Sequence, residues 1–298
     1  MTATIIDGKQ VAESIRAELK EEVAKLKAKG IVPGLGVVLV GVDPASISYV
    51  TAKERTCAEL GIYSDDNHLP AETTQEELMA VVQRLNADPK VNGILVQLPL
   101  PSHLNEAEVL IAIDPNKDVD GFHPTNVGKM VVGEKAFLPC TPHGVIQLLL
   151  RSGVKLEGAH TVIVGRSNIV GKPLMNMLVQ KNPTGNATVT VCHTRTKDVG
   201  YHTRQADIIV AAAGRPNTIT ADMVKEGVAV IDVGVNRIED ATKKSGFRLV
   251  GDVDFEAVKE KASFITPVPG GVGPMTITML MYNTVESAKR AAGICSES

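Results

Sequence analysis

The fold is decided by residues 162–173, which read Val-Ile-Val-Gly-Arg-Ser-Asn-Ile-Val-Gly-Lys-Pro. The apolar run ends at Gly165, and the sequence after it predicts a helix over residues 170–180. Gly165 allows a tight turn and the close approach of a phosphate, and the helix start would supply unpaired N–H groups and a positive dipole. The spacing is not G-x-G-x-x-G, because Gly171 comes six residues after Gly165. On spacing alone, an ordinary strand-to-helix turn is equally consistent with this stretch.

The segment after the next predicted strand, at residues 192–196, bears on which dinucleotide would fit. It reads Cys-His-Thr-Arg-Thr and lies where a Rossmann-type fold contacts the adenosine ribose. The acidic residue that would bind a free 2′-hydroxyl is absent, whereas arginine and hydroxyl groups suit a 2′-phosphate. Together with Arg166, the segment favours NADP over NAD, with a solvated polar loop as the alternative.

Working outward, short apolar strands alternate with helices along the chain. Apolar runs predict strands, and apolar residues recurring every three or four positions predict helices. The predicted strands cover residues 35–40, 93–97, 161–164, 188–192, 208–212 and 228–233, and the predicted helices cover 11–29, 44–60, 76–85, 106–113, 142–151, 170–180 and 274–292. This alternation indicates an α/β fold with parallel sheets that are covered on both faces.

The chain length of 298 residues allows one large domain or two ordinary ones. Residues 114–141 interrupt the alternation with several prolines and glycines, so the sequence places a domain junction near residues 140–150. The final helix follows a second loop rich in glycine and proline, and from the pattern alone it could pack on either domain.

Composition excludes several classes of protein. A net charge of −3 and only nine aromatic residues (four Tyr, five Phe, no Trp) argue against a nucleic-acid partner. The longest apolar runs are far shorter than the roughly 20 residues that span a bilayer, and no signal peptide is recognised. Four scattered cysteines predict a reduced, cytoplasmic protein, and seven isolated histidines predict no metal site.

Two polar side chains on the predicted helix 44–60 are candidates for chemistry. Tyr49 and Lys53 are four residues apart and share one face, beside an apolar stripe that contains Val50 and Cys57. An aromatic ring next to an ammonium group suits a flat heterocyclic substrate, and a partly buried lysine can transfer protons. The alternative is a surface lysine beside a half-buried tyrosine.

Polar groups in two further segments lie where ligands bind in α/β proteins. Gln97 ends an apolar strand, and ligands bind at the carboxyl ends of such strands, although the amide could instead cap free backbone groups. Residues 117–121 read Lys-Asp-Val-Asp-Gly, a tight loop that is too short for a calcium site and could be an ordinary turn.

The segment 266–276 reads Thr-Pro-Val-Pro-Gly-Gly-Val-Gly-Pro-Met-Thr and is expected to lack regular structure. Its flanking segments favour a specifically folded ligand wall over a flexible connection.

Together these segments closely resemble the bifunctional methylenetetrahydrofolate dehydrogenase/methenyltetrahydrofolate cyclohydrolase family. The motifs occur in the family's order and cover nearly the whole chain. They are Tyr49 with Lys53, Val-Gln-Leu-Pro-Leu at 96–100, Lys-Asp-Val-Asp-Gly at 117–121, Pro-Cys-Thr-Pro at 139–142, Val-Gly-Arg-Ser at 164–167 and Pro-Gly-Gly-Val-Gly-Pro-Met-Thr at 269–276.

The resemblance implies two α/β domains with a folate cleft between them, and a homodimer. The catalytic and folate-binding domain would comprise residues 1–141 and 274–298, and the NADP-binding, Rossmann-type domain residues 142–273. Lys53 would be the key catalytic residue, with Tyr49 stacking on the folate, Gln97 tuning Lys53 and Asp120 holding the pterin. The other expected folate contacts are Val96, Leu98, Pro269, Gly270, Gly271, Gly273 and Thr276, and the expected NADP contacts are Gly165, Arg166, Ser167, Thr194 and Val235.

The activity implied is oxidation of 5,10-methylenetetrahydrofolate with NADP, followed by hydrolysis of the methenyl product to 10-formyltetrahydrofolate in one-carbon metabolism. Three rival interpretations stay open: a dehydrogenase without hydrolase activity, an unrelated two-domain dehydrogenase, and a nucleotide-sensing binding protein. The sequence gives no role for His123, His143 or His202, and it favours Cys140 as a buried structural thiol over a residue that lines the cleft.

Overall fold

The computed structural model describes residues 2–243 and 246–294 and divides the chain into two compact units. Unit 1 comprises Met1–Glu13 and Thr141–Thr276, and unit 2 comprises Ser14–Cys140 and Ile277–Ser298. The boundaries fall within or at the ends of three helices, α1 (Gly8–Ala28), α6 (Cys140–Arg151) and α10 (Val272–Ala291).

Unit 1 is built on a six-stranded sheet in which every neighbouring pair of strands is parallel. In spatial order the strands are β1 (Thr4–Ile5), β11 (Phe264–Ile265), β8 (Ala229–Asp232), β7 (Ile208–Ala211), β5 (His160–Val164) and β6 (Thr188–Cys192). The chain passes from β5 to β6 on one side and then returns to β7 on the other side of β5. The strand order therefore reverses between β5 and β7, which is where open α/β sheets bind their ligands.

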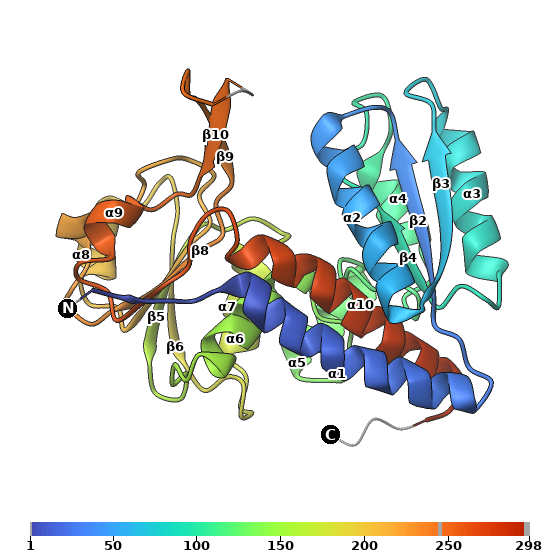
Figure 1. The fold of residues 1–298 in the computed structure, drawn as a ribbon, viewed down its shortest axis with the longest axis horizontal. Coiled ribbons are helices and arrows are strands. Elements are labelled where there is room, and N and C mark those ends of the chain that lie inside the picture. The colour runs from blue at the N-terminus through green and yellow to red at the C-terminus, as the bar shows by residue number, and fades with distance from the viewer. Residues whose placement is uncertain (1, 244–245, 295–298) are drawn as a thin grey trace. The chain divides into compact units, whose positions relative to one another are not determined.

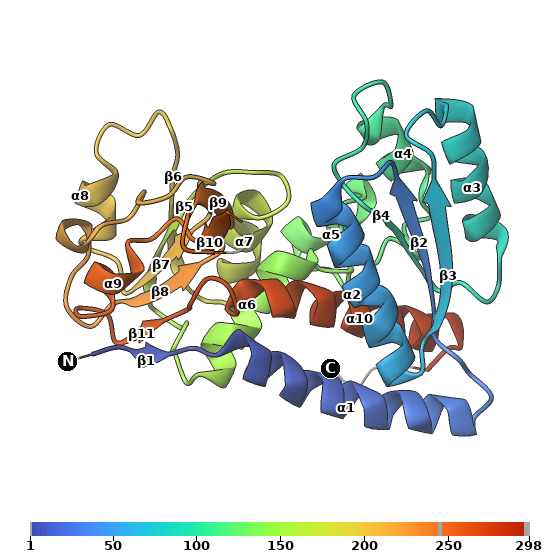
Figure 2. The same cartoon turned by 45° about the horizontal axis from the view of Figure 1, so that its top comes forward.

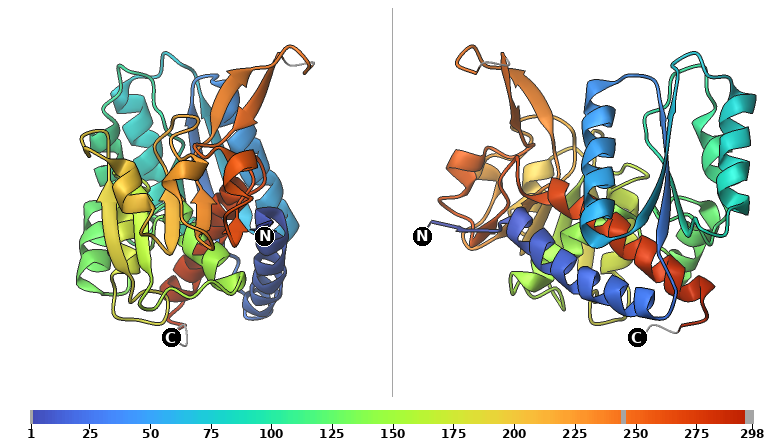
Figure 3. Two further views of the ribbon diagram at one scale, coloured as in Figure 1. Left: turned by 90° about the vertical axis from the view of Figure 1, so that its left-hand side faces the viewer. Right: turned by 45° about the vertical axis from the view of Figure 1, so that its right-hand side comes forward.

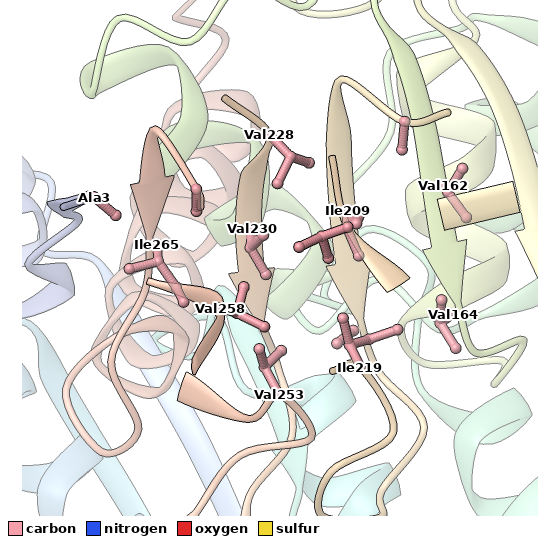
Figure 4. Packing of buried hydrophobic residues seen from close by; sticks show 14 of the residues in the cluster. Ala3, Val162, Val164, Ile209, Ile219, Val228, Val230, Val253, Val258 and Ile265 are labelled. Atoms are coloured by element: carbon pink, nitrogen blue, oxygen red, sulfur yellow. The ribbon is translucent and has the colours of Figure 1, made fainter. Parts of the chain in front are cut away.

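Helices cover both faces of this sheet (Figure 1 and Figure 2). On one face, apolar side chains from neighbouring strands, among them Val162, Ile209, Val230 and Ile265, form one cluster with Ile219, Val253 and Val258 (Figure 4). These strand residues are almost entirely β-branched and fully buried, as expected for a parallel sheet that is enclosed on both sides. The remaining helices of unit 1 are α7 (Gly171–Leu178), α8 (Val199–Thr203), the 3₁₀ turn η1 (Ala221–Met223) and α9 (Phe255–Val258).

Unit 2 contains a smaller parallel sheet with the strand order β3–β2–β4. Its central strand is buried at every position, and the helices α3 and α4 cover one of its faces through a core that includes Val38, Leu78, Leu85 and Val109. The helix α2 lies on the opposite face (Figure 1). The elements are β2 (Gly34–Val40), α2 (Pro44–Leu60), β3 (Tyr63–Leu69), α3 (Gln75–Ala87), β4 (Gly93–Val96), α4 (Glu106–Ala112) and α5 (Pro124–Val132).

The α/β class with parallel sheets is confirmed, and every strand and helix that the sequence predicts is present with small shifts at its ends. The structure adds β3, which sequence patterning missed because its residues are polar. β3 is an edge strand, and its side chains Asp65 and Asn67 bond to Arg84 on α3 at 2.6–3.2 Å. These contacts on the edge strand replace the apolar packing that identifies a central strand.

Residues 114–141, expected to be irregular, contain the helix α5. Pro124 occupies the start of this helix, where a proline needs no N–H partner, and Gly133 ends it in the left-handed conformation. An antiparallel hairpin of β9 (Asn236–Glu239) and β10 (Phe247–Val250) was also not expected, and it projects from the rest of unit 1 (Figure 3).

The N-terminal residues differ from the expected domain boundaries. Met1–Glu13 cluster with unit 1, although the sequence grouped them with residues 14–141. The reason is β1, in which Thr4 pairs with Phe264 and Ile5 with Ile265 at the edge of the six-stranded sheet. A two-residue strand carries no detectable periodicity, so only its tertiary partner reveals it.

Within the described residues, none of the helices combines the length and the apolar character needed to span a bilayer.

The start of α2 offers a test of a local rule. Asp43 caps this helix by accepting a hydrogen bond from the Ser46 N–H at 2.8 Å. We expect Asp43→Ala to lower the free energy of unfolding by about 1 kcal/mol, because one N–H at the helix start loses its partner. Urea denaturation would measure the loss, and Asp43→Ser, which retains a capping oxygen, should recover most of it. Equal stability of the alanine and serine variants would contradict this explanation.

Candidate active site

A buried lysine on α2 forms the centre of the candidate site in unit 2. Lys53 is only 6 % exposed, and its Nζ donates a hydrogen bond to Oε1 of Gln97 at 2.8 Å. Gln97 directly follows β4, and its Nε2 donates to the Leu98 carbonyl at 2.6 Å, which turns Oε1 toward Lys53. The surface-lysine interpretation is therefore wrong. The interpretation of Gln97 as a cap of free backbone groups accounts for Nε2, which donates to the Leu98 carbonyl, but not for Oε1, which accepts from Lys53.

The loop 117–121 extends toward this lysine, and its two outer positions fix its shape. Lys117 Nζ donates to three carbonyls at the carboxyl end of α3, those of Leu85, Asn86 and Asp88, at 2.8–3.2 Å. Gly121 has φ = 76°, and a side chain there would collide with the backbone of residues 137–139. The first and last residues of the motif thus anchor the loop.

Asp118 anchors the same loop from the other side. Its carboxylate accepts hydrogen bonds from the N–H groups of Phe122 and His123 and from Nδ2 of Asn126, at 2.8–3.2 Å. Since Asp118 and Lys117 are both engaged in structure, Asp120 is the carboxylate of the motif that is left for the site. The ordinary-turn interpretation of this motif underestimates how strongly the loop is held.

Burial controls the electrostatics of the site. It lowers the pKa of Lys53, and the nearby Asp120 carboxylate partly opposes that effect. Burial also raises the pKa of Asp120 to about 6, and the charge of Lys53 partly opposes this second shift. The two groups stabilise each other's charged forms, so a change in the protonation of one shifts the pKa of the other.

Cys140 lies beside these groups and is itself buried. Its Sγ donates to the Val119 carbonyl at 3.4 Å, and burial together with Asp120 raises the pKa of its thiol well above the ordinary value. A thiol with a raised pKa stays protonated and is a poor nucleophile. The structure therefore favours a structural role for Cys140 at the border of the site.

Two polar side chains of α10 support the site and were missed by sequence reasoning. Asn283 Nδ2 donates to the carbonyls of Val119 and Leu138 at 2.8 and 2.9 Å. The Ser287 hydroxyl lies 2.6 Å from the Asn92 carbonyl oxygen and 3.0 Å from that of Asn116, and shares its one proton between them. Both are buried and four residues apart on one helix face. Two polar residues four positions apart in a mostly apolar helix were the sequence pattern that could have indicated these buried contacts.

The remaining expected folate contacts are divided between the two units. Tyr49 lies one turn before Lys53 on α2 and is 39 % exposed, which leaves its ring accessible, while Val96 and Leu98 flank Gln97. The residues Pro269, Gly270, Gly271, Gly273 and Thr276 belong to unit 1.

The segment 266–276 is only partly irregular. Helix α10 begins at Val272, so Val272–Thr276 form its first turn, in which Pro274 requires no hydrogen-bond partner for its nitrogen. The preceding loop is tightly folded: Gly270 has φ = 105°, and a side chain at Gly271 would collide with Pro267 and Thr266. The expectation of a specifically folded loop agrees with these contacts.

The carboxyl edge of β5 and β6 in unit 1 carries the expected dinucleotide residues. Gly165 has φ = 142°, and a Cβ there would lie 2.1 Å from the carbonyl oxygen of Ala212. Ser167 Oγ accepts a hydrogen bond from the Val170 N–H at 3.1 Å and so holds the start of α7. Arg166 and Ser167 are both exposed next to this turn.

The turn after β6 presents its side chains at the same edge. Val164 pairs with Cys192, so the turns that follow β5 and β6 are neighbours. The turn is ordered by hydrogen bonds from the His193 N–H to Thr196 and from the Arg195 N–H to His193. Thr194 and Arg195 are exposed there, and Val235, which is 54 % exposed, follows β8.

Three histidines without a predicted role have structural positions. His123 Nδ1 accepts from the Thr125 N–H at 3.1 Å and caps α5. Burial lowers the pKa of His143 to about 4, so it is neutral at pH 7, and His202 packs edge-on against Tyr201. Among residues 2–243 and 246–294, no cluster of three or more His, Cys, Asp or Glu side chains could hold a metal ion.

Two family profiles match the chain over most of its length. The profile described as "Tetrahydrofolate dehydrogenase/cyclohydrolase, catalytic domain" matches residues 6–120, and "Tetrahydrofolate dehydrogenase/cyclohydrolase, NAD(P)-binding domain" matches residues 139–292. The chain belongs to the tetrahydrofolate dehydrogenase/cyclohydrolase family. Membership of this family excludes the unrelated two-domain dehydrogenase.

Relatives in this family match along the full chain. A protein of Syntrophus aciditrophicus named bifunctional protein FolD is 60 % identical over 99 % of this chain and 100 % of its own length. The crystal structure of bifunctional FolD methylenetetrahydrofolate dehydrogenase/cyclohydrolase from Campylobacter jejuni has a TM-score of 0.91 at 54 % identity, covering 97 % of this chain and 99 % of its own. The Trypanosoma brucei dehydrogenase-cyclohydrolase, solved with NADP and an inhibitor, has a TM-score of 0.93 at 42 % identity, covering 98 % and 99 %.

The range matched by the catalytic-domain profile, residues 6–120, includes Lys53, its partners Gln97 and Asp120, and Tyr49. The NAD(P)-binding profile contains the exposed residues at the carboxyl edge of β5 and β6.

The coupling between Lys53 and Asp120 can be tested by titration. We expect Asp120→Asn to lower the pKa of Lys53 further. The ionised carboxylate, present above about pH 6, favours the protonated ammonium and an amide does not. The 13Cε chemical shift of Lys53 through a pH titration would measure the change. Glu54→Gln is the matched control, because it removes a carboxylate that bonds to His68 instead. An unchanged or higher Lys53 pKa in Asp120→Asn would disprove the coupling.

Proposed function

We propose that this chain oxidises 5,10-methylenetetrahydrofolate to 5,10-methenyltetrahydrofolate with NADP, and then hydrolyses that product to 10-formyltetrahydrofolate. The observation that carries the proposal is the buried Lys53, bonded to Gln97 and coupled to Asp120, within a chain that belongs to the tetrahydrofolate dehydrogenase/cyclohydrolase family. Enzymes place a lysine in such surroundings when its proton must move near neutral pH.

The oxidation step asks the protein mainly for positioning. A lone pair on a substrate nitrogen expels the hydride, and bound NADP supplies the acceptor carbon at C4 of the nicotinamide. No protein acid or base is needed for that transfer, so this chain's contribution is orientation. Tyr49 would stack on the flat folate ring, and Asp120 would accept hydrogen bonds from the donor edge of the pterin.

The hydrolysis step requires proton transfer. Water adds to the cationic methenyl carbon and loses a proton, and then one C–N bond breaks while its nitrogen is protonated. The hydroxyl on that carbon loses its proton as the bond breaks, so the carbon becomes a formyl group that stays on the other nitrogen. Lys53 would move these protons, because its lowered pKa makes a neutral amine accessible. Gln97 cannot titrate, and its hydrogen bond would orient the Lys53 amine toward the reacting carbon.

The remaining site assignments are part of the same proposal. We assign the folate-binding and catalytic role to unit 2 and the cofactor-binding role to unit 1. The further folate contacts are Val96, Leu98, Pro269, Gly270, Gly271, Gly273 and Thr276, and the NADP contacts are Gly165, Arg166, Ser167, Thr194 and Val235. The exposed arginines beside the adjacent ends of β5 and β6 support recognition of a 2′-phosphate.

Two further properties rest on the family resemblance and on cysteine usage. We propose a homodimer and a cytoplasmic location. Cys57, Cys140 and Cys192 are buried and not joined in disulfides, and this arrangement suits a reducing compartment. Sedimentation at micromolar concentration would decide the assembly, because a monomer would contradict it.

The Lys53 assignment predicts a separation of the two activities. We expect Lys53→Met to abolish hydrolysis of methenyltetrahydrofolate, since the proposed mechanism assigns the proton transfers to Lys53 and uses Asp120 to bind the pterin, and to weaken oxidation much less. Absorbance of the methenyl product would report both steps, with NADP omitted for the hydrolysis assay. Lys20→Met, which changes an exposed lysine, is the control. Undiminished 10-formyltetrahydrofolate production by Lys53→Met would refute the assignment.

A second prediction concerns the choice of dinucleotide. We expect Arg166→Ala to raise the KM for NADP at least about tenfold more than the KM for NAD, because only NADP carries the 2′-phosphate. Initial rates with each cofactor would give both constants. Arg204→Ala, at an exposed arginine that pairs with Asp198, serves as the control. Equal effects on the two cofactors would argue against 2′-phosphate recognition by Arg166.

A further inference from the structure

Two fully enclosed carboxylates lie side by side below the carboxyl edge of the six-stranded sheet. Asp232 ends β8 and is 3 % exposed, and Asp252 follows β10 and is 0 % exposed. The Asp252 N–H donates to Asp232 Oδ1 at 2.9 Å, and Asp232 also accepts from the N–H groups of Gly234 and Val253. Burying a carboxylate costs free energy of folding unless its oxygens accept hydrogen bonds, and both oxygens of Asp232 do so.

The oxygens of Asp252 hold the turn that follows β7. Oδ2 accepts hydrogen bonds from the N–H groups of Ala213 and Gly214 at 2.6 and 2.9 Å, and Oδ1 accepts from the N–H of Arg215 at 2.9 Å. Three consecutive N–H groups thus point inward at one side chain. All three residues are nevertheless exposed, so the outer face of the turn is accessible to a ligand.

The same carboxylate also holds the segment that follows β8. Asn236 Nδ2 donates to Asp252 Oδ1 at 2.8 Å, and a Cβ added to Gly234 would lie 2.2 Å from that oxygen. Gly234 can therefore be replaced only by displacing Asp252. One side chain consequently sets the position of both the turn 213–215 and the segment 234–236, which contains the exposed Val235.

The turn 213–215 borders the place where the order of strands reverses, and the segment 234–236 follows β8, the next strand beyond β7. β7 is the neighbour of β5, and the carbonyl of Ala212, directly before the turn, packs against Gly165 at the end of β5. Ligands of open α/β sheets bind outside the carboxyl ends of the strands at this reversal. The turn held by Asp252 thus lies directly beside the Gly165 turn.

We propose that Asp252 is a positioning residue for the dinucleotide, holding the turn 213–215 and the segment 234–236 in the shape that NADP requires. This inference rests on the proposed function, which places NADP at this edge. Asp252 itself is enclosed by protein donors and acts through the backbone of the two segments.

Asp252→Asn tests the proposal with little change in size. An amide offers one acceptor oxygen where the carboxylate has two, so at least one pair of the four N–H donors loses its partner. We expect the Kd for NADP, measured by calorimetry, to rise about tenfold or more, because small displacements of a binding wall have large effects. The KM for NADP in oxidation should rise in parallel, whereas hydrolysis of methenyltetrahydrofolate without NADP should stay within about twofold of the wild type.

Asp254→Asn is the matched control. Asp254 lies two residues after Asp252 and caps α9, so the variant removes the same charge from a carboxylate that does not hold the two segments. It should leave the Kd for NADP unchanged. A folded Asp252→Asn protein with wild-type affinity for NADP overturns the proposal, as does an equal loss of both activities, which would indicate a merely structural role.

Asn236→Ala decides the question if Asp252→Asn does not fold. It removes one donor to Asp252 and keeps the carboxylate, so we expect the Kd for NADP to rise about threefold. An unchanged Kd would overturn the proposal. Wild-type assays separate this inference from the proposed function. Absence of folate oxidation by the wild type would defeat the proposed function, while the calorimetric comparison would still decide the role of Asp252.

Discussion

Parallel strands end in backbone groups that the sheet itself cannot pair, and in both units buried side chains complete those hydrogen bonds. Loops at the carboxyl edge must turn sharply while their N–H and C=O groups leave water. In unit 2, Asp118 and Asn283 satisfy the backbone around the loop that carries Asp120, and Lys117 ties that loop to the carboxyl end of α3. In unit 1, Asp232 and Asp252 do the same for the segments after β7 and β8. The shape of each edge therefore depends on a few enclosed polar groups.

The same constraint explains the chemistry available at Lys53. An ammonium that is 6 % exposed has lost most of its water, and the hydrogen bond to Gln97 and the charge of Asp120 compensate for part of that loss. The compensation is incomplete, so the pKa of Lys53 falls and that of Asp120 rises to about 6. Groups with shifted pKa values can exchange protons near neutral pH, whereas fully compensated ion pairs cannot.

Sequence patterning succeeded wherever a segment's own residues determine its structure. The helix predicted over residues 44–60 is α2, which Asp43 caps and Gly61 ends, and the buried strands have continuous apolar runs. It failed for β3, whose polar residues are explained by an edge position, and for β1, which is defined only by pairing with β11. In each case the deciding contact comes from a segment distant in sequence.

The sequence by itself determined the α/β class, the chain's family and which residues are able to carry chemistry. Apolar periodicity and motifs are properties of short segments, and their order can be read along the chain. Only the tertiary structure decided that Lys53 is buried and faces Gln97, that Lys117 and Asp118 anchor a loop while Asp120 is left for the site, and that Asp252 holds two other loops. The burial of a side chain and its hydrogen-bond partners depend on segments that are far apart along the chain. Packing of the fold decides which of these segments come together. The roles of chemically identical side chains, such as Asp118 and Asp120, therefore separate only in the folded protein.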